Sequence, residues 1–375
     1  MNKNLLVFEF LKLNTRKNIA ILVFFLVLIT FFLIFNNNIN KNSAENKINE
    51  YEFEINSITQ AIKGLPETAA TEKVKKDLTT DLEIKKNQVT AILNGDWKTN
   101  LDLQIQSDEK LLANINTGAA ISAFSPEDLE SAISLNKEFL NRNIEPMAND
   151  SGTEGLYFSK SITSIFYSLT GVIVLVFFFG NILAGEIEKG TIRFLFTQPI
   201  SKMNILGTKY FTTIAASVFI ILLIFLFSFV ISSSIFGIGS TNYPILVRNT
   251  DDFLIINLSE LLINNTVLFI MVIIFTITLL FFFSTISGSS MLATGLTIIT
   301  TIVCTTAISK VEFISSVAHL IPFSYINTWN VINGEVTLNF NNNNITFMHG
   351  VIVLLVYSIV LYIITCILFK KKELV

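Results

Sequence analysis

The chain has 375 residues, 51% of them hydrophobic and 34 of them Phe, and its mean hydropathy is +0.60. This composition excludes an ordinary water-soluble enzyme and predicts an integral membrane protein with several spans. The net charge of −3 says little as a total, but most of the charged residues fall in one block, between residues 41 and 160.

Residues 1–35 are predicted to form an N-terminal interfacial helix followed by the first span. One acid, Glu9, stands against four basic residues: Lys3, Lys12, Arg16 and Lys17. Three apolar residues of this segment share a helical face, which favours a helix on the inner leaflet: Leu6, Phe10 and Leu13. The run Ile19–Phe35 is long enough for one span. Asn36–Asn38 follow it in place of a small-residue cleavage site, which predicts an uncleaved anchor with a cytoplasmic N-terminus.

Residues 36–159 are predicted to form an extracellular, mostly helical domain. With 20 acids and 12 bases they are polar, and they are far too numerous for a loop. Five residues keep the spacing of a coiled-coil seam: Ile48, Tyr51, Ile55, Ile58 and Ile62. A break at Gly64–Pro66 precedes a second helix with a similar seam: Leu78, Leu82, Val89 and Leu93.

A third helix of this domain has a clear start signal. Ser125 is a predicted N-cap, Pro126 suits the first turn, and the acids Glu127 and Asp128 follow. Leu101–Ile105 is a weaker candidate for a strand. The segment contains no Cys, so no disulfide bond is expected to stabilise it.

Five further apolar runs bring the predicted number of transmembrane helices to six: Ile162–Ala184, Tyr210–Ile235, Ile263–Phe283, Met291–Ile308 and Val351–Phe369. The sequence therefore predicts an all-α membrane protein in which the extracellular helical domain is inserted between the first and second spans. The second and third spans fall in residues 160–236, the fourth and fifth in 263–308, and the sixth, with a basic C-terminal tail, in 349–375.

Two segments between these spans are predicted on the outer side. Residues 237–262 carry the loop signals Gly239 and Pro244. Residues 309–348 are extracellular or, at His319–Tyr325, re-entrant. The tail after the sixth span is basic, so both termini of the multi-pass chain are predicted to lie on the cytoplasmic side of the cell membrane.

A charged segment, residues 185–209, separates the second span from the third. No charged residue lies between Lys160 and Glu186, and none lies between Lys209 and Arg248. The segment must therefore lie at a membrane surface. Its four basic residues predict the cytoplasmic side: Lys189, Arg193, Lys202 and Lys209.

Local signals in this segment predict a short helix lying across the bilayer face. Gly190 suits a left-handed helix end, and Thr191 can cap the next helix. An apolar face follows at helical spacing: Ile192, Leu195 and Phe196. Pro199 ends that helix, and Ser201 can cap the following one. From this pattern alone, an ordinary connection between two spans remains open as an alternative.

The acids Glu186 and Glu188 lie near the C-terminus of the preceding helix, where the helix dipole disfavours negative charge. Acids in such a place usually have a partner.

These residues resemble the signature of the ABC type-2 permease family, the membrane subunits of ABC exporters. The residues that carry the resemblance are Glu186, Glu188, Gly190, Thr191, Leu195, Pro199, Ser201, Lys202 and Lys209. The family more often has Arg where this chain has Lys202, which keeps the charge but lacks the planar guanidinium. The resemblance implies that the segment is a coupling helix that docks on a separate ATP-binding cassette ATPase subunit. It also implies that the permease works with a second copy or a homologous permease.

The rest of the sequence offers no catalytic chemistry. It contains no phosphate-binding loop, so any ATP is expected to bind the partner subunit and no cofactor is predicted. His319 and His349 are far apart in the chain and have no clustered carboxylates, so no metal site is predicted. Cys304 and Cys366 fall in spans and are interpreted as packing residues. No basic patch interleaved with aromatic residues indicates nucleic-acid binding.

We therefore predict a non-enzymatic permease subunit of an ATP-driven exporter. The apolar bodies of the spans hold no ionisable residue, which argues against an ion-driven carrier. Phe177–Phe179 and Phe281–Phe283 would suit an amphiphilic substrate such as an antimicrobial peptide, a lipid or an apolar drug, unless these residues simply face lipid. The alternative is a membrane sensor or immunity protein that binds a ligand through its extracellular domain without transporting it.

Overall fold

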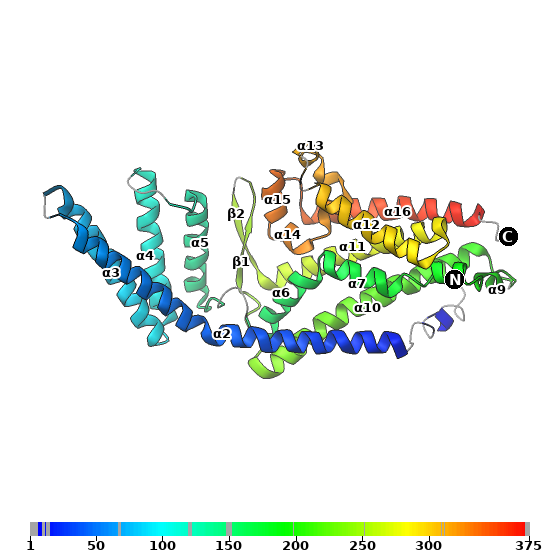
Figure 1. Cartoon of the computed structure of the whole chain (residues 1–375), viewed down its shortest axis with the longest axis horizontal. Helices are drawn as coiled ribbons and strands as arrows, with labels where there is room; N and C mark the ends of the chain where they lie inside the picture. The colour runs from blue at the N-terminus through cyan, green and yellow to red at the C-terminus, as the bar shows by residue number, and fades with distance from the viewer. Residues whose placement is uncertain are drawn as a thin grey trace.

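The computed structural model describes residues 7–9, 12, 16–66, 69–118, 122–147, 152–197, 199–250, 252–308, 310 and 312–371; the side chains of residues 16–25, 69–70 and 312–313 lie outside the description. The predicted apolar face of Leu6, Phe10 and Leu13 also lies outside the described residues. Figure 1 shows an elongated molecule built almost entirely of helices.

Five described segments are long and apolar enough to cross a membrane: Leu169–Glu188, Lys202–Phe236, Leu258–Ser287, Ser290–Ile308 and Phe347–Lys371. They are α7 (Leu169–Phe179) with α8 (Ala184–Glu188), then α10, α11, α12 and α16, and they match the second to sixth predicted spans. The predicted first span belongs to α2 (Arg16–Gly64), a helix of 49 residues. Because part of its side chains are not described, the count of six spans stays a prediction.

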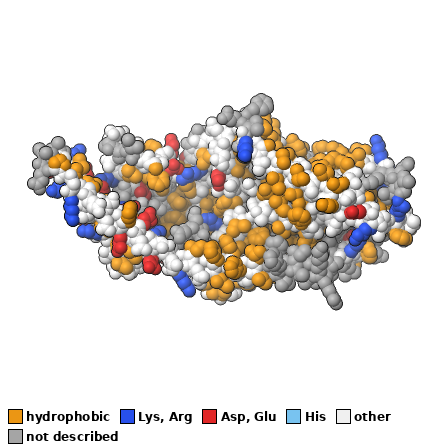
Figure 2. All heavy atoms as spheres, viewed as in Figure 1, with side chains coloured by type: hydrophobic (Ala, Val, Ile, Leu, Met, Phe, Trp, Pro, Cys, Tyr) orange, Lys and Arg blue, Asp and Glu red, His pale blue; other side chains and the backbone are white. Residues whose placement is uncertain are grey.

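Charged and hydrophobic side chains cover different parts of the surface, as expected of a protein that spans a membrane. In Figure 2 the charged side chains gather mainly towards the two ends of the long axis, and hydrophobic side chains cover much of the helices between them. α2, α10 and α16 also expose many large apolar residues along their lengths. A soluble protein would not leave such a band in water.

The predicted second span, Ile162–Ala184, is not one helix, and the candidate span begins only at Leu169. α6 (Gly155–Phe166) ends at Tyr167, and α7 begins at Leu169. The groups freed by the break find partners near α14 (Thr328–Ile332). The Thr328 hydroxyl donates to the Tyr167 carbonyl at 2.8 Å, and the Leu169 N–H donates to Asn327 Oδ1 at 3.2 Å. A helix break inside a membrane is tolerated only where protein groups satisfy the backbone in this way.

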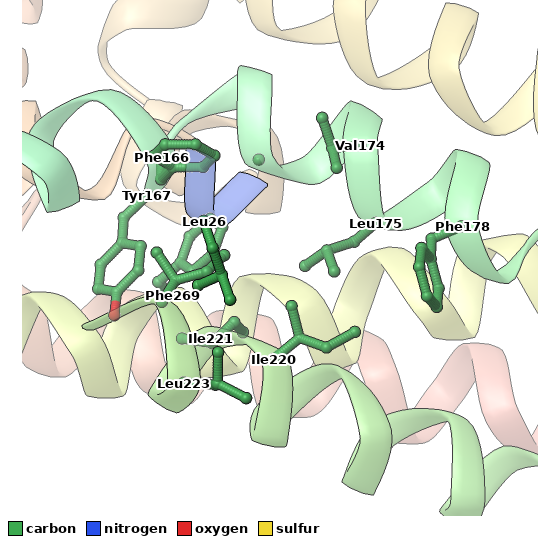
Figure 3. A pocket seen from close by; sticks show the side chains of 12 residues that line it. Leu26, Phe166, Tyr167, Val174, Leu175, Phe178, Ile220, Ile221, Leu223 and Phe269 are labelled. Atoms are coloured by element: carbon green, nitrogen blue, oxygen red, sulfur yellow. The ribbon is translucent and has the colours of Figure 1, made fainter. Parts of the chain in front are cut away.

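A small apolar cavity of about 40 Å³ lies beside this break. Figure 3 shows side chains from α2, α7, α10 and α11 around it, among them Leu26, Leu175, Ile221 and Phe269. The Tyr167 ring stacks on Phe269 with its centroid 4.6 Å away. The break is therefore supported by polar contacts and by aromatic stacking, with unfilled apolar space next to it.

The inserted domain consists of α2 beyond residue 36 together with α3 (Ala69–Leu93), α4 (Trp97–Asn116) and α5 (Pro126–Arg142). Each of these helices packs on the next, as Figure 1 shows from α2 to α5. The predicted start of α5 is confirmed, because Ser125 Oγ accepts the Asp128 N–H at 3.1 Å.

The strand expected at Leu101–Ile105 is wrong. These residues belong to α4, and Leu101 and Ile105 are both buried. They are four positions apart and so share one helical face. The short apolar pattern did not distinguish this spacing from the alternation of a strand.

The segment expected as a loop at 237–262 contains the one sheet among the described residues, so the fold is mostly helical and not all-α. β1 (Pro244–Arg248) and β2 (Phe253–Asn257) pair antiparallel, with Pro244 opposite Asn257. The ring of Tyr243, just before β1, lies 5.0 Å from Phe139 of α5 and 4.9 Å from Tyr157 of α6. The hairpin thus joins the inserted domain to the spans.

Residues 312–340 form short elements packed against the longer helices: α13 (Glu312–Ser315), η2 (Ala318–Leu320), η3 (Pro322–Tyr325), α14 and α15 (Glu335–Phe340). η3 contacts α12 and α16, and α14 contacts α11. Tyr325 is fully buried and donates from its hydroxyl to the His319 carbonyl at 2.8 Å. The depth of this segment in the bilayer, and with it the re-entrant assignment, stays a prediction.

Candidate functional site

Residues 185–209 are here called the coupling segment, after the role that their sequence predicts. The segment has the expected turn and cap geometry at two of three positions. Gly190 adopts a left-handed conformation with φ of +68°, directly after the end of α8. Ser201 caps α10 (Lys202–Phe236), because its Oγ accepts the Asn204 N–H at 3.3 Å. Between them lies α9 (Ile192–Phe196), which ends before Pro199.

The predicted cap at Thr191 is wrong. Thr191 precedes α9 but has helical angles, φ −66° and ψ −22°, and its side chain makes no cap hydrogen bond. A capping side chain needs an extended backbone to reach back to the helix N–H groups. Its hydroxyl donates instead to the Glu186 carbonyl, over a long 3.4 Å, and so contacts the end of α8.

Glu186 belongs to a group of four charged residues, here called the charge cluster: Glu9, Lys12, Glu186 and Lys209. Three of them are buried, and the Lys12 side chain is 50% exposed. Lys209 Nζ donates to Glu9 Oε1 at 2.6 Å. It also lies 2.8 Å from Glu186 Oε2, at the distance of an ion pair although not in hydrogen-bond geometry. Lys12 donates to Glu186 Oε1 from the other side. The Lys209 side chain is completely buried, and those of Glu9 and Glu186 are 4% and 8% exposed.

The second acid of the pair, Glu188, reaches the start of α12 (Ser290–Ile308). Its Oε2 accepts the Ser290 N–H at 2.9 Å and the Ser290 hydroxyl at 2.6 Å. A carboxylate is favoured at a helix N-terminus, where unpaired N–H groups and the positive end of the dipole lie. Both acids near the end of α8 therefore have partners, and these partners lie on different elements.

α9 presents one face to the protein and the opposite one to its surroundings. On the inner face Ile192 is fully buried, and Leu195 and Phe196 are half-buried, as their spacing predicts. The Phe196 ring contacts Phe369 of α16 (Phe347–Lys371) edge to face at 6.1 Å. Lys202 Nζ lies 5.1 Å from the Phe196 ring centroid, within the range of a cation–π contact.

The outer face of α9 exposes Arg193 and Phe194, and Phe194 is 75% exposed. Lys189 and Pro199, just outside α9, are exposed as well. A large aromatic residue and two cations are thus grouped on an accessible surface at the end of the spans. Such a combination is typical of a protein-docking surface.

Residues 8–374 match the family described as ABC-2 family transporter protein. The chain belongs to this family.

One curated relative of this ABC-2 family protein is the uncharacterized protein YhcI of Bacillus subtilis strain 168. It is 24% identical over 287 residues, which cover 75% of this chain and 85% of YhcI. No solved structure matches the chain. The family match establishes the permease resemblance that the coupling segment carries, and it extends that resemblance to nearly the whole chain.

Sequence reasoning missed several residues of the site in this ABC-2 family protein. It singled out Lys209 and Glu186 without pairing them, and it treated Glu9 only as the lone acid of the N-terminal segment. Ser290 and Phe369, the partners of the segment on α12 and α16, had no local signal. Phe194 lies off the predicted apolar face of α9, and that position could have indicated its exposure.

The described residues hold no group of three or more His, Cys, Asp and Glu side chains that could bind a metal ion. The fold does bring the two histidines closer than their sequence separation implied, with ring centroids 6.4 Å apart. His319 Nδ1 contacts Asn342 Nδ2 at 3.2 Å, and His349 Nδ1 contacts Thr346 Oγ1 at 3.0 Å. Two partnered imidazoles, with no carboxylate grouped with them in the described part of the chain, offer too few ligands for a stable site.

Proposed function

We propose that this ABC-2 family membrane protein is the permease subunit of an ATP-driven exporter and that α9 is its coupling helix. One observation carries the proposal: the coupling segment is exposed on one face, and its other face is tied to several elements. The exposed face carries Phe194 and Arg193. On the other face, the charge cluster links the segment to the N-terminal segment and α10. Glu188 contacts α12, and Phe196 contacts α16.

This arrangement lets a push on α9 reach the spans. Closure of two ATPase subunits against the exposed face would displace α9 as a short lever between α8 and α10. Ile192 is fully buried and the cluster contacts are short, so the displacement would be passed on as a tilt of the neighbouring helices. ATP would bind only to the partner subunit, and a second copy or a homologous permease would complete the transporter.

The interrupted second span would assist such a tilt. α7 can pivot at Tyr167, where the helix hydrogen bonds are already broken and replaced by contacts to Thr328 and Asn327. The apolar cavity beside the break (Figure 3) leaves some unfilled space next to α7. Discrete hinges of this kind are the usual way in which packed helices change their arrangement.

The docking role of α9 can be tested with two matched substitutions. Phe194→Glu places a charge on the proposed docking surface, and Phe53→Glu does the same on the inserted domain, where Phe53 is 76% exposed. Tagged chains are purified from host membranes in mild detergent. We expect an ATP-binding subunit to accompany the wild type and Phe53→Glu, and its recovery to fall about tenfold or more with Phe194→Glu.

The chain alone should show no ATP hydrolysis. If no ATP-binding protein accompanies the wild-type chain, the permease assignment is wrong, and a sensor or immunity protein would give this result. If Phe194→Glu and Phe53→Glu reduce the recovery equally, the docking surface is wrong.

The exported compound is proposed to be an amphiphile, such as an antimicrobial peptide, a lipid or an apolar drug. The spans offer aromatic rather than ionisable side chains: Phe177 is 66% exposed, whereas Phe179 and Phe281 are packed inside. A susceptibility screen of cells with and without the transporter tests the class. Protection against membrane-active peptides or apolar drugs supports it, and a phenotype confined to a small ion excludes it.

The proposed orientation places the coupling segment and both termini in the cytoplasm and the inserted domain outside. After replacement of Cys304 and Cys366 by Ala, single cysteines at Asn94 and Ser201 report on the two sides, because both positions are exposed. An impermeant thiol reagent should label Asn94→Cys in intact cells and Ser201→Cys only after lysis. The opposite pattern would invert the topology.

A further inference from the structure

A second cavity, of about 590 Å³, lies where the inserted domain meets the spans. α2, α5, α6 and α14 contribute to its lining, and so do four consecutive residues at the start of the β hairpin, 243–246. Side chains of consecutive strand residues point to opposite faces of a strand. A cavity that touches all four residues therefore runs along the edge of β1 and not along one face. We call it the strand-edge cavity, and its volume is within the range of ligand-binding sites, about 300–1,000 Å³.

Hydrogen bonds at the two ends of β1 show which way its backbone groups point. The Tyr243 carbonyl accepts the Leu258 N–H at 2.9 Å, on the side of β2. The Arg248 N–H donates to the Asn333 carbonyl at 3.1 Å, on the opposite side. In an antiparallel pair, alternate residues turn their N–H and C=O groups towards the partner strand. The odd-numbered residues of β1 therefore face β2, and the even-numbered residues face away from it.

The backbone groups of Leu246 point away from β2 along the strand-edge cavity. Asn333 takes up the corresponding N–H of Arg248, but no partner of the Leu246 N–H is found in the described part of the chain. The preceding even-numbered residue, Pro244, has no N–H, and its carbonyl also points away from β2. Open strand edges readily pair with a further strand. This edge therefore offers one donor and two acceptors to an extended backbone.

The other walls of the strand-edge cavity favour uncharged side chains. Phe32 of α2, Phe139 of α5 and Ile165 of α6 make them largely apolar. Lys160, the one charged side chain among the described lining residues, already interacts with other groups of the protein, and its Nζ lies 5.8 Å from the centroid of the Trp329 ring. Lys160 therefore needs no counter-charge from a ligand. A ligand with main-chain amides and apolar side chains fits the open edge and these walls together.

Two acids lie beside the strand-edge cavity, where the inserted domain joins α6. Glu145 is exposed and directly precedes Pro146, a lining residue. The Glu154 carboxylate lies against Gly239, shortly before β1. Burial and the charge of Glu145 raise the pKa of the Glu154 carboxyl, so the two negative charges are close enough to repel each other. A cation next to the apolar part of a ligand would relieve this repulsion.

We propose that the strand-edge cavity binds an extended peptide, which pairs with Leu246 as an added strand of the hairpin. Its apolar side chains lie against Phe32 and Phe139, and a basic residue beside them lies near Glu145 and Glu154. At an open sheet edge, main-chain hydrogen bonds provide affinity, and pockets for alternate side chains provide specificity. The inference narrows the amphiphile of the proposed function to a peptide, and it rests on that function only for the export of the bound peptide.

Trp329 can report on binding because it lines the cavity. The chain has two Trp residues, so Trp97→Phe leaves Trp329 as the one tryptophan donor for energy transfer to a dansyl label. The full chain in phosphatidylcholine nanodiscs is titrated, without ATP, with a dansyl-labelled peptide of one lysine followed by alternating valine and phenylalanine. The part of the signal that excess unlabelled peptide displaces measures binding at the site. We expect a saturable, displaceable signal.

A methylated form of the peptide tests the main-chain contacts. Methylation of its backbone nitrogen atoms keeps the charge and the side chains but removes every main-chain donor. We expect this form to bind about tenfold more weakly or worse, because each hydrogen bond contributes about 0.5–1.5 kcal/mol. In addition, amide hydrogen exchange of residues 244–248 should slow when the unmethylated peptide is added. Both measurements leave β1 unaltered, so they hold even if a variant of this strand fails to fold.

Three substitutions locate the peptide on the hairpin. Leu246→Pro removes the outward N–H, a change that an open strand edge tolerates, and should weaken binding about three- to tenfold. Leu246→Val keeps the N–H and should retain the affinity. Ile255→Pro is the matched control. Ile255 lies opposite Leu246 in the register, so its N–H points away from β1 at the far edge of β2, outside the described cavity lining. This control should bind the peptide as the parent chain does.

Three results would overturn the proposal: no displaceable signal, equal binding of the methylated and unmethylated peptides, or equal effects of Leu246→Pro and Ile255→Pro. Equal binding of the two peptides would assign the cavity to apolar compounds in general. Neither ATP nor an ATP-binding subunit takes part in these measurements. A failure here therefore leaves the permease assignment standing, whereas a failure of co-purification would overturn that assignment without touching peptide binding.

Discussion

The inserted domain and the coupling segment both use ion pairs, but in different environments. In the inserted domain, one pair joins each helix to the next at 2.6–2.7 Å: Glu54–Lys85, Asp81–Lys110 and Glu109–Lys137. Their side chains are between 14% and 53% exposed. In the charge cluster, Lys209 is completely buried, and its two carboxylate partners are less than 10% exposed.

This difference in burial determines how strongly the ion pairs of each region contribute to stability. Exposed pairs contribute about 0–1 kcal/mol and are screened by salt, so they align the helices of the inserted domain without locking them. A buried charge is stable only with its partners, and loss of one partner costs about 3–5 kcal/mol. The charge cluster therefore holds Glu9 of the N-terminal segment, α8 and α10 in one arrangement.

Substitution of Lys209 by Met should produce the largest effect. Among the described residues it removes the one cation that contacts both Glu9 and Glu186, and it leaves two buried carboxylates close together. We expect a loss of about 3–5 kcal/mol of stability, measured as a lower midpoint of thermal unfolding in detergent.

Lys189→Met is the matched control, because Lys189 is an exposed lysine of the same segment. Its midpoint should stay close to the wild type. If the two Met variants unfold at the same temperature, the charge cluster does not hold this end of the molecule together.

Local signals were sufficient for several features of the fold. The starts of α5 and α10 follow from Ser125 and Ser201, and the turn after α8 follows from Gly190, because caps and left-handed turns depend on a few neighbouring residues. The spans follow from long apolar runs. The inner face of α9 follows from the spacing of Ile192, Leu195 and Phe196.

Features that depend on distant contacts could not be predicted. The break at Tyr167 lies inside an apolar run and is stabilised by Thr328, which is 161 residues away. The pair between Glu9 and Lys209 spans 200 residues. The hairpin at 244–257 is a different case. Its two apolar, β-branched runs flank the turn residues Asn249 and Asp252, a local signal that the prediction of a loop overlooked.

Asp108 offers a pH-dependent test of the inserted domain. Burial raises the pKa of this carboxyl above its usual range, although the hydrogen bond from Gln104 and the charge of Lys85 oppose the shift. Because the folded state binds the proton more readily than the unfolded state, this carboxyl lowers stability as the pH rises through its folded pKa. Asp108→Asn keeps an oxygen that can accept the Gln104 amide at 2.8 Å but removes the charge.

We therefore expect Asp108→Asn to raise the unfolding midpoint at pH 7 and to lose that advantage as the pH falls towards 4. The informative quantity is the difference in unfolding midpoint between the variant and the wild type, because the other carboxylates change the midpoints of both proteins alike. Asp102→Asn, on the same helix, is the control. If Asp108→Asn raises the unfolding midpoint by the same amount at every pH, the added stability comes from packing and not from the charge.

The smallest effect is expected at the outer end of the same series of ion pairs. Lys137 and Glu109 lie 2.6 Å apart, but their side chains are 53% and 48% exposed. Water and salt compete for both charges, so Lys137→Gln should cost only about 0.2–0.5 kcal/mol. A double-mutant cycle with Glu109→Gln isolates the pair, and its coupling energy should shrink further in high salt. A coupling energy that approached the Lys209→Met loss would mean that the inserted domain is held as rigidly as the coupling segment.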